Sequence, residues 1–322
     1  MAGSGYAGVV HTRLMLAALA ALATLPCARP AAAQWGVWPG DSLLAIGRLA
    51  SAESAYYAAV RRSPRDPVAR AALGKYLAAR GATRVGAVLL EEAQFFGGDS
   101  ISLARALVPL YERLGDFAAL DSLTPNVLAA AERRRARWLR DKQLHASFRD
   151  SVILLSYRPL ADGQGFGTLM LRLGQAQVVA LIDPRVSGVV VPATMRGDLR
   201  TFGADRSGAA VIEALRMSGI VFSNVPATIG APDERVRIGF DVLAPYSPTF
   251  DPRRGVIVLR RVERRSQPPA GARVPALYDG NGMRLLIGDR WQPTSGAMAA
   301  MLLATRPWMW DGRRGDVVLL IP

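Results

Sequence analysis

The sequence predicts a multidomain chain in which an all-α array of helical repeats precedes a mainly β domain. The chain has 322 residues and is 50% hydrophobic, which is enough for one large core or two ordinary ones. Residues 35–125 repeat a pattern with a period of 34 residues, which indicates stacked repeat units. Beyond residue 150 apolar and polar residues alternate with a period of two, which is typical of strands.

Residues 1–33 have the pattern of a secretory signal peptide. His11 and Arg13 precede an apolar run from Leu14 to Leu25, and a small-residue segment ends at Ala33. The alternative, a membrane anchor, needs about 20 apolar residues, and this run is shorter. We therefore expect cleavage after Ala33, a periplasmic or secreted location, and no transmembrane segment in the mature chain.

Removal of residues 1–33 leaves few residues for metal or thiol chemistry. The single cysteine, Cys27, is lost, and His145 is then the only histidine. A structural zinc site, a thiol nucleophile and a disulfide framework all need residues that are absent. We expect no metal and no cofactor, and any catalysis must use carboxylates, hydroxyls or basic groups.

The chain is strongly basic, with a net charge of +14 and a pI near 10.9. Such a charge favours anionic partners, for example a membrane surface or nucleic acid. Only Lys75 and Lys142 are lysines among 40 basic residues, however, and this bias toward arginine also fits a biased genome composition. The densest cluster, "AERRRARWLRDK" at 131–142, predicts a basic linker helix over 126–148 with an exposed charged face. An exported protein seldom meets nucleic acid, so none is expected as a partner.

The repeat in residues 35–125 places a glycine every 34 residues, at Gly47, Gly81 and Gly115. In the first unit, "GRLASAESAYYAAVRRSPRDP", small residues alternate with the bulky Tyr56, and Pro64 follows the second helix. This pattern resembles the tetratricopeptide repeat. The resemblance implies stacked helix pairs that bind a protein or peptide partner of unknown identity. The alternative is that three short repeats only cap the next domain. We expect few contacts between this unit and the strands that follow the basic helix.

The region 150–262 contains a series of short strands. "SVILLSYRPL" and "GTLMLRLGQAQVVALID" predict strands, with a hairpin turn at Gly174 and Gln175. "SGVVVP" follows Asp183, and "IEALRMSGIVFSNVPATIG" predicts two strands around Ser218 and Gly219. "IGFDVLAPYSPTFDPRRGVIVL" predicts a short helix and a closing hairpin. This order of elements resembles the retropepsin-like aspartic peptidases, which implies a mainly β acid-protease barrel.

The resemblance places Asp183 where the catalytic acid of the family stands. Pro184 replaces the Thr or Ser of the family's Asp-Thr-Gly or Asp-Ser-Gly motif, and Arg185 replaces the glycine. Proline offers neither a hydroxyl nor an N–H, and a nearby guanidinium favours an ionised carboxylate. We therefore interpret Asp183 as an inactive remnant, held by Arg185 in a turn. Asp241 and Asp251 are expected to shape turns.

Residues 263–322 predict a β-rich extension. "FDPRRGVIVL" at 250–259 recurs as "WDGRRGDVVL" at 310–319, with six of ten residues identical. "GMRLLIGDRW" predicts a further strand and "SGAMAAMLLATR" a helix. We interpret the extension as a possible partial second lobe that covers the edge strands through which relatives dimerise. The alternative is two unrelated hairpins with common turn chemistry. The aspartates of the extension are Asp279, Asp289, Asp311 and Asp316. None of them is part of an Asp-Thr-Gly or Asp-Ser-Gly motif.

Three functions remain open from the sequence. The favoured one is a non-catalytic exported protein in which the repeats and a degenerate peptidase fold bind a protein or peptide. The second is an active aspartic endopeptidase that uses Asp183 in a homodimer. The third is a basic binder of anionic envelope polymers.

Overall fold

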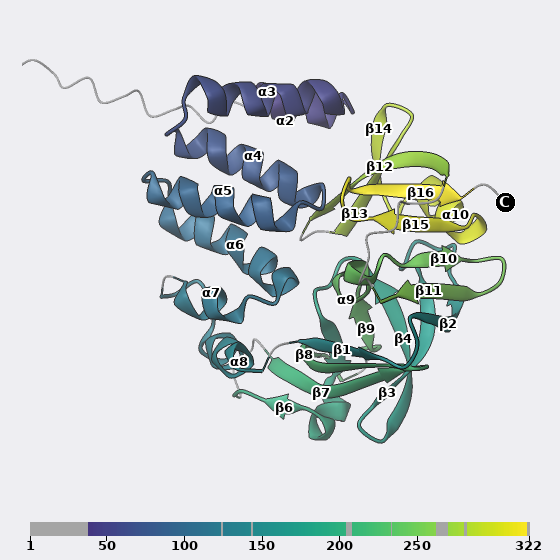
Figure 1. Cartoon of the computed structure of the whole chain (residues 1–322). Helices are drawn as coiled ribbons and strands as arrows, with labels where there is room; N and C mark the ends of the chain where they lie inside the picture. The colour runs from purple at the N-terminus through teal and green to yellow at the C-terminus, as the bar shows by residue number, and fades with distance from the viewer. Residues whose placement is uncertain are drawn as a thin grey trace, which may run out of the picture. The chain divides into compact units, whose positions relative to one another are not determined.

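The structure, a computed structural model, describes residues 38–123, 125–142, 144–203, 208–232, 234–261, 270–279 and 282–320. The predicted signal peptide lies outside these residues. One compact unit extends from Pro39 to the end of the chain and contains both the helices and the strands (Figure 1). No helix in the described ranges is long and apolar enough to span a lipid bilayer.

Six helices form successive pairs in the region where the 34-residue period occurs. They are α2 (Pro39–Ala45), α3 (Leu49–Arg62), α4 (Pro67–Ala79), α5 (Thr83–Phe95), α6 (Ser100–Leu114) and α7 (Phe117–Ser122). The turn inside each pair contains a glycine with positive φ, at Gly47 (+76°), Gly81 (+88°) and Gly115 (+66°). Residues with a Cβ rarely adopt this conformation, which explains why glycine recurs there. Helical pairing is therefore present, while the tetratricopeptide assignment stays a prediction.

Six strands close into a barrel. They are β3 (Gly167–Leu173), β4 (Ala176–Asp183), β5 (Val189–Pro192), β7 (Ala209–Met217), β8 (Ile220–Gly230) and β9 (Arg237–Gly239). The ring runs β3-β4-β9-β5-β8-β7 and returns to β3. The β4–β9 and β5–β8 pairs are parallel and the other pairs are antiparallel. The hairpin turns at Gly174–Gln175 and Ser218–Gly219 are confirmed.

Further elements cover or extend the barrel. They are β1 (His145–Phe148), β2 (Val152–Pro159), η1 (Ala193–Asp198), β6 (Arg200–Thr201), α9 (Phe240–Leu243), η2 (Ala244–Tyr246), β10 (Thr249–Asp251) and β11 (Val256–Arg260). β2 pairs with both β3 and β11, and β11 pairs with β10. The strands hide alternate side chains, and α9 contributes the fully buried Phe240 and Leu243 to the core. The structure therefore contains the predicted mainly β barrel and its closing hairpin.

The C-terminal extension, residues 271–320, continues the same sheet. It consists of β12 (Gly271–Asp279), β13 (Gly282–Ile287), β14 (Arg290–Pro293), α10 (Ala297–Thr305), β15 (Trp308–Asp311) and β16 (Asp316–Leu320). The segment predicted as a single strand, "GMRLLIGDRW", instead forms β13 and β14, because residues between Ile287 and Arg290 make a tight turn. The predicted helix is present as α10.

The two similar sequence segments form similar hairpins that pair with each other. β10 pairs antiparallel with β15, with Thr249 opposite Met309 and Phe250 opposite Trp308. The backbone N–H of Trp310 completes the pairing with the carbonyl of Pro248 at 3.1 Å. Because equivalent positions are 60 residues apart, these contacts relate the hairpins by a local two-fold pattern around the Thr249–Met309 pair.

The predicted basic linker helix over 126–148 is too long. The helix α8 covers only Ala130–Arg140, and His145–Phe148 form β1, which pairs with β8. Its charged face is not fully exposed either, because Arg135 is buried and donates to the carbonyl of Ala227 at 2.9 Å and to Glu112 at 2.8 Å. His145 is exposed, as expected.

The expectation of few contacts between helices and strands is wrong. Arg80, at the end of α4, donates to the backbone carbonyls of Ala276 and Gly315 and to the carboxylate of Asp316. The indole N–H of Trp291 donates to the carbonyl of Leu44 at 2.5 Å. The helices therefore contact the C-terminal extension at several points separated along the array.

Candidate functional site

Asp183 is the last residue of β4 and is completely buried. Its position is fixed by parallel pairing with β9, where Asp183 lies opposite Gly239. The residues before it, Ala180 to Ile182, are buried apolar residues of the barrel core. A carboxylate at this place has no water to solvate it and therefore requires charged or hydrogen-bonding partners.

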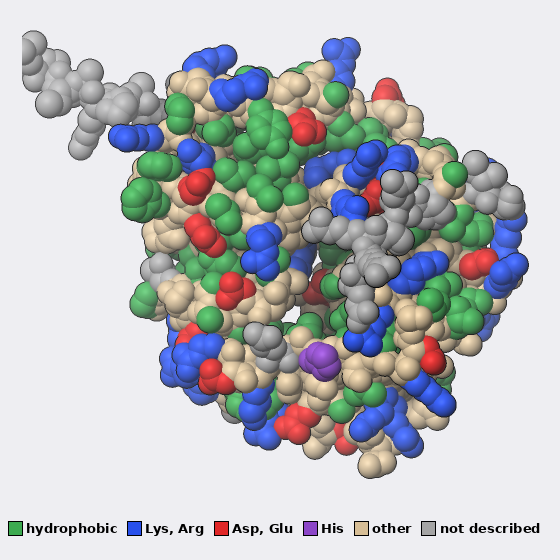
Figure 2. Space-filling model, in the orientation of Figure 1, with side chains coloured by type: hydrophobic (Ala, Val, Ile, Leu, Met, Phe, Trp, Pro, Cys, Tyr) green, Lys and Arg blue, Asp and Glu red, His purple; other side chains and the backbone are tan. Residues whose placement is uncertain are grey.

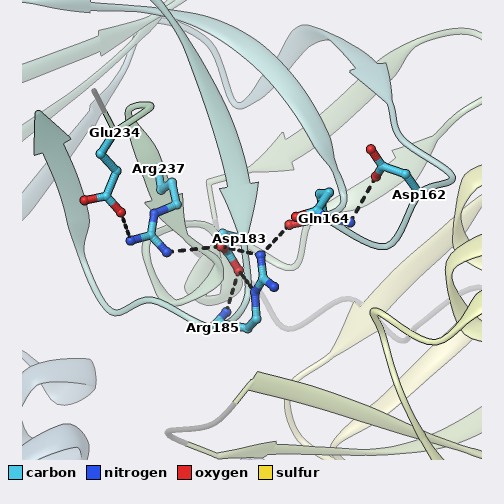
Figure 3. A network of polar contacts seen from close by, with 6 residues as sticks. All are labelled: Asp162, Gln164, Asp183, Arg185, Glu234 and Arg237. Atoms are coloured by element: carbon cyan, nitrogen blue, oxygen red, sulfur yellow. Dashed lines mark hydrogen bonds and ion pairs between the residues drawn. The ribbon is translucent and has the colours of Figure 1, made fainter. Parts of the chain in front are cut away.

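Arg185 supplies most of those partners (Figure 3). Oδ1 of Asp183 accepts from the backbone N–H of Arg185 at 2.9 Å and from Nε at 2.8 Å. Oδ2 accepts from Nη2 of the same guanidinium at 2.9 Å. This is a two-pronged arginine–carboxylate contact within a three-residue turn, and the turn provides the third bond.

A second arginine completes the network from another strand. Nη1 of Arg237, on β9, lies 3.5 Å from Oδ2 of Asp183, and the same guanidinium is paired with Glu234. The Nη2 group of Arg185 also donates to the carbonyl of Gln164 at 2.7 Å. In the described part of the chain, every hydrogen bond and ion pair of the Asp183 carboxylate goes to Arg185 or Arg237.

These contacts keep Asp183 ionised. Burial alone would raise its pKa, but the hydrogen bonds from the side chain and backbone of Arg185 and the charges of both arginines outweigh burial. The pKa of Asp183 is therefore below its ordinary value. An aspartic peptidase instead needs two carboxyl groups that share one proton and activate a water molecule. Here the oxygens of Asp183 already accept from arginines and Pro184 offers no hydroxyl.

Among the described residues, Asp241 and Asp251 do not form a dyad with Asp183. Asp241, at the start of α9, accepts from the hydroxyl of Ser187 at 2.7 Å and from the backbone N–H of Gly188 at 3.0 Å. Burial raises the pKa of Asp241 despite these bonds. Asp251 accepts from the backbone N–H groups of Arg253 and Arg254 in the β10–β11 turn. Both residues shape turns, as the sequence predicts.

Among the described residues, no acid of the C-terminal extension forms a hydrogen bond or an ion pair with Asp183. The extension lies close to the neighbouring Arg185 at Gly282, where a Cβ would be 3.2 Å from Cγ of Arg185. The tail acids are used elsewhere: Asp311 pairs with Arg273, Asp316 with Arg80, and Asp279 with Arg284. Asp289 lies at the exposed β13–β14 turn beside Arg290.

A charged seam beside α9 was not predicted from the sequence. The guanidinium of Arg113, on α6, lies 4.5 Å from the ring centre of Tyr278 and donates to its carbonyl at 3.2 Å. Glu112 pairs with Arg135, and burial raises the pKa of Glu112. Glu112 and Arg113 lie in the 34-residue repeat, but the repeat pattern does not indicate their partners, Arg135 and Tyr278, which lie outside it.

An open hollow of about 600 Å³ lies at the edge strand β6. Leu199 and Ile212 give it apolar surface, and Asp198, Arg200 and Glu213 give it charge. No group of three or more metal-ligating side chains occurs among residues that the structure describes.

Comparison with known proteins finds a weak structural similarity. No family model matches the chain. No curated protein matches it either. The chain is weakly similar to a solved structure described as "Crystal structure of a retropepsin-like aspartic protease from Rickettsia conorii". The alignment has 13% sequence identity and a TM-score of 0.27, and covers 36% of this chain and 94% of that one.

Proposed function

We propose that the protein is a non-catalytic, exported protein that binds a protein or peptide. In this proposal the barrel is a degenerate retropepsin-like domain, the helices are tetratricopeptide-like repeats, and the protein works in the periplasm or outside the cell. Intact mass of the exported form tests the last point, because retention of residues 1–33 contradicts it.

The observation that carries the non-catalytic assignment is the arginine clamp on Asp183. Three hydrogen bonds from one residue, Arg185, engage both oxygens of the carboxylate. To activate water, at least one oxygen of Asp183 would have to exchange its arginine partner for a water molecule. Asp183 and a second carboxyl group would also have to take up a shared proton. The lowered pKa of Asp183 opposes that proton uptake.

Two surface features support a binding role. Val85 and Val88 lie three residues apart on α5, so they share one helix face, and their side chains are about half exposed. The hollow at β6 combines apolar and charged lining beside an edge strand, and edge strands can pair with an extended peptide. The active homodimeric peptidase remains the alternative that an experiment must address.

We also propose that residues 271–320 are a partial second lobe that leaves the protein monomeric. The pairing of β15 with β10 supports this, because it occupies an edge that another chain would otherwise use. Light scattering tests the idea, and a stable dimer joined through the barrel would contradict it.

The decisive experiment offers an unbiased peptide library to the chain from Gln34 to Pro322, between about pH 3 and about pH 8. Mass spectrometry detects cleavage, and a peptide array detects binding. We expect binding without cleavage, and equal results for Asp183→Ala. Cleavage that disappears in Asp183→Ala would overturn the non-catalytic assignment.

A second pair of variants tests where the peptide binds. Val85→Asp with Val88→Asp removes the apolar face of α5, while Arg61→Gln with Arg62→Gln changes exposed residues of α3 and serves as the control. Array binding should fall in the first variant and persist in the second. Absence of array binding by the unmodified chain contradicts the binding role.

A further inference from the structure

The outer surface of the barrel carries two exposed arginines directly opposite each other. Arg172 on β3 lies opposite Arg216 on β7, and both side chains are exposed. Like charges placed directly across a strand pair destabilise it. Neither arginine takes part in an ion pair with the described residues, and the exposed acid of β7, Glu213, is paired with Arg200. The pair therefore presents unneutralised positive charge to the solvent.

Exposed apolar residues lie next to this pair on the same sheet surface. Met170 is two residues before Arg172 on β3, so both side chains point to the same side. Opposite Met170 on β4 lies Val179, and the two are 48% and 57% exposed. An apolar cross-strand pair and a basic cross-strand pair thus stand side by side.

The same combination continues on β2. Leu154 is 60% exposed and lies opposite Val258 of β11. Arg158, four residues further along β2, is also exposed and lies opposite Thr168 of β3. Figure 2 shows both basic and apolar side chains on the visible surface of the strand-rich region. We define the outer barrel face as these six residues: Leu154, Arg158, Met170, Arg172, Val179 and Arg216.

We propose that the outer barrel face docks on the surface of an anionic lipid bilayer. Apolar side chains gain from entering the boundary between headgroups and acyl chains, and arginines gain from lipid phosphates at the same depth. A soluble polyanion would satisfy the arginines but leave the apolar pairs in water. The bilayer surface is the occupant whose chemistry matches both parts of the face, and the net charge of +14 favours approach to it.

The docking is tested by co-sedimentation with vesicles. The protein is the chain from Gln34 to Pro322, which contains the whole compact unit and lacks the apolar run of residues 14–25. Vesicles of phosphatidylcholine with phosphatidylglycerol are compared with vesicles of phosphatidylcholine alone. We expect sedimentation with the anionic vesicles, reduced by salt, and little with the zwitterionic ones.

Two face variants separate the charged and apolar contributions. Arg172→Gln with Arg216→Gln should weaken partition about 25-fold, at about 5-fold for each arginine. Met170→Ser with Val179→Ser should weaken it about 10-fold. The controls are Arg61→Gln with Arg62→Gln and Met301→Ser with Val68→Ser, which make the same changes at exposed residues of the helices and should leave partition unchanged.

The outcomes distinguish docking from general adsorption. Thermal unfolding midpoints equal to that of the unmodified chain show that the face variants are folded. Absence of sedimentation with anionic vesicles overturns the proposal, as do face variants that bind as well as their controls. If only the arginine variant loses vesicle binding, the proposal is also overturned. That result would mean that the protein adsorbs by charge alone and that its apolar side chains do not enter the bilayer. Peptide binding on the array is measured without vesicles, so either proposal can fail independently.

Discussion

The hairpins β10–β11 and β15–β16 share the same Asp-x-Arg-Arg-Gly turn but belong to regions with different architectures. The first hairpin belongs to a region that closes into a barrel and holds a buried acid, Asp183, at the end of β4. The second belongs to an extension whose β12–β14 strands do not close into a ring. Its buried acids Asp311 and Asp316 pair with Arg273 of β12 and with Arg80 at the end of α4. The comparison shows that two hairpins with similar sequences can have the same fold while their acids have different partners.

The junction between the two hairpins is mainly aromatic. Phe250 and Trp308 stack with ring centres 4.1 Å apart, and both side chains are almost completely buried. Phe166 contacts both rings at close to right angles. Burial of these large rings is sufficient to hold the extension against the barrel. The side-chain hydrogen bonds of Arg80, Arg113 and Trp291 instead join the extension to the helices.

The largest predicted effect breaks the contact between helices and extension. Arg80 lies 2.8 Å from the buried carboxylate of Asp316, and Arg273 lies 3.6 Å from it. Arg80→Ala therefore removes the closer of these two cationic partners. We expect a loss of about 3 kcal/mol in the free energy of unfolding, measured by urea denaturation. Arg84→Ala, an exposed arginine on α5, is the matched control and should change stability by less than about 0.5 kcal/mol.

A double variant separates two causes of the lost stability: the uncompensated buried charge of Asp316 and the lost attraction between Arg80 and Asp316. Arg80→Met with Asp316→Leu removes both charges, so the buried site no longer contains an ion without a partner. It should recover much of the stability that Arg80→Ala loses. If Arg80→Ala is as stable as the Arg84→Ala control, the helices and the extension do not depend on this pair.

Local features of the two regions could be predicted from the sequence. Alternating apolar residues and Gly-containing turns give the β3–β4 and β7–β8 hairpins, and the repeated Asp-x-Arg-Arg-Gly segment gives two similar turns. The contact of Arg185 with Asp183 follows from their spacing, because an Asp side chain readily accepts bonds from the residue two positions later. Such features depend on neighbours in the chain, which the sequence displays directly.

Contacts between distant segments could not be predicted in this way. Arg237 reaches Asp183 only because β9 pairs with β4, and Arg80 reaches Asp316 across 236 residues. The basic stretch gave no sign that Arg135 is buried, since its partners, Glu112 and Ala227, come from other elements. β1 was missed because its four residues are too few to establish a period of two.

A smaller effect concerns the buried acid of the barrel. Asp183→Asn keeps the shape of the side chain but removes the charge that Arg185 binds, so we expect a loss of about 2 kcal/mol near pH 7. The folded pKa of Asp183 is depressed, so its stabilisation is present above the unfolded pKa of about 3.9 and is lost as the pH falls through the folded value. Urea denaturation at several pH values should show the two proteins converging below about pH 4. A difference that grows on acidification contradicts the arginine clamp.

The smallest effect compares the two turns themselves. Asp251 accepts from two backbone N–H groups at 3.2 Å, and its ion pair with the exposed Arg254 at 3.7 Å contributes little, so Asp251→Ala should lose about 1 kcal/mol. Asp311 accepts from the N–H of Arg313 in the same way but also binds Arg273 at 2.8 Å and is only 6% exposed. Asp311→Ala should therefore lose about 2 kcal/mol, because it also removes the closest carboxylate partner of Arg273, which is left with Asp316 at 3.6 Å. Urea denaturation of both variants measures the difference. Equal losses would mean that the turn alone sets the contribution of each acid, and that Arg273 adds nothing to the second hairpin.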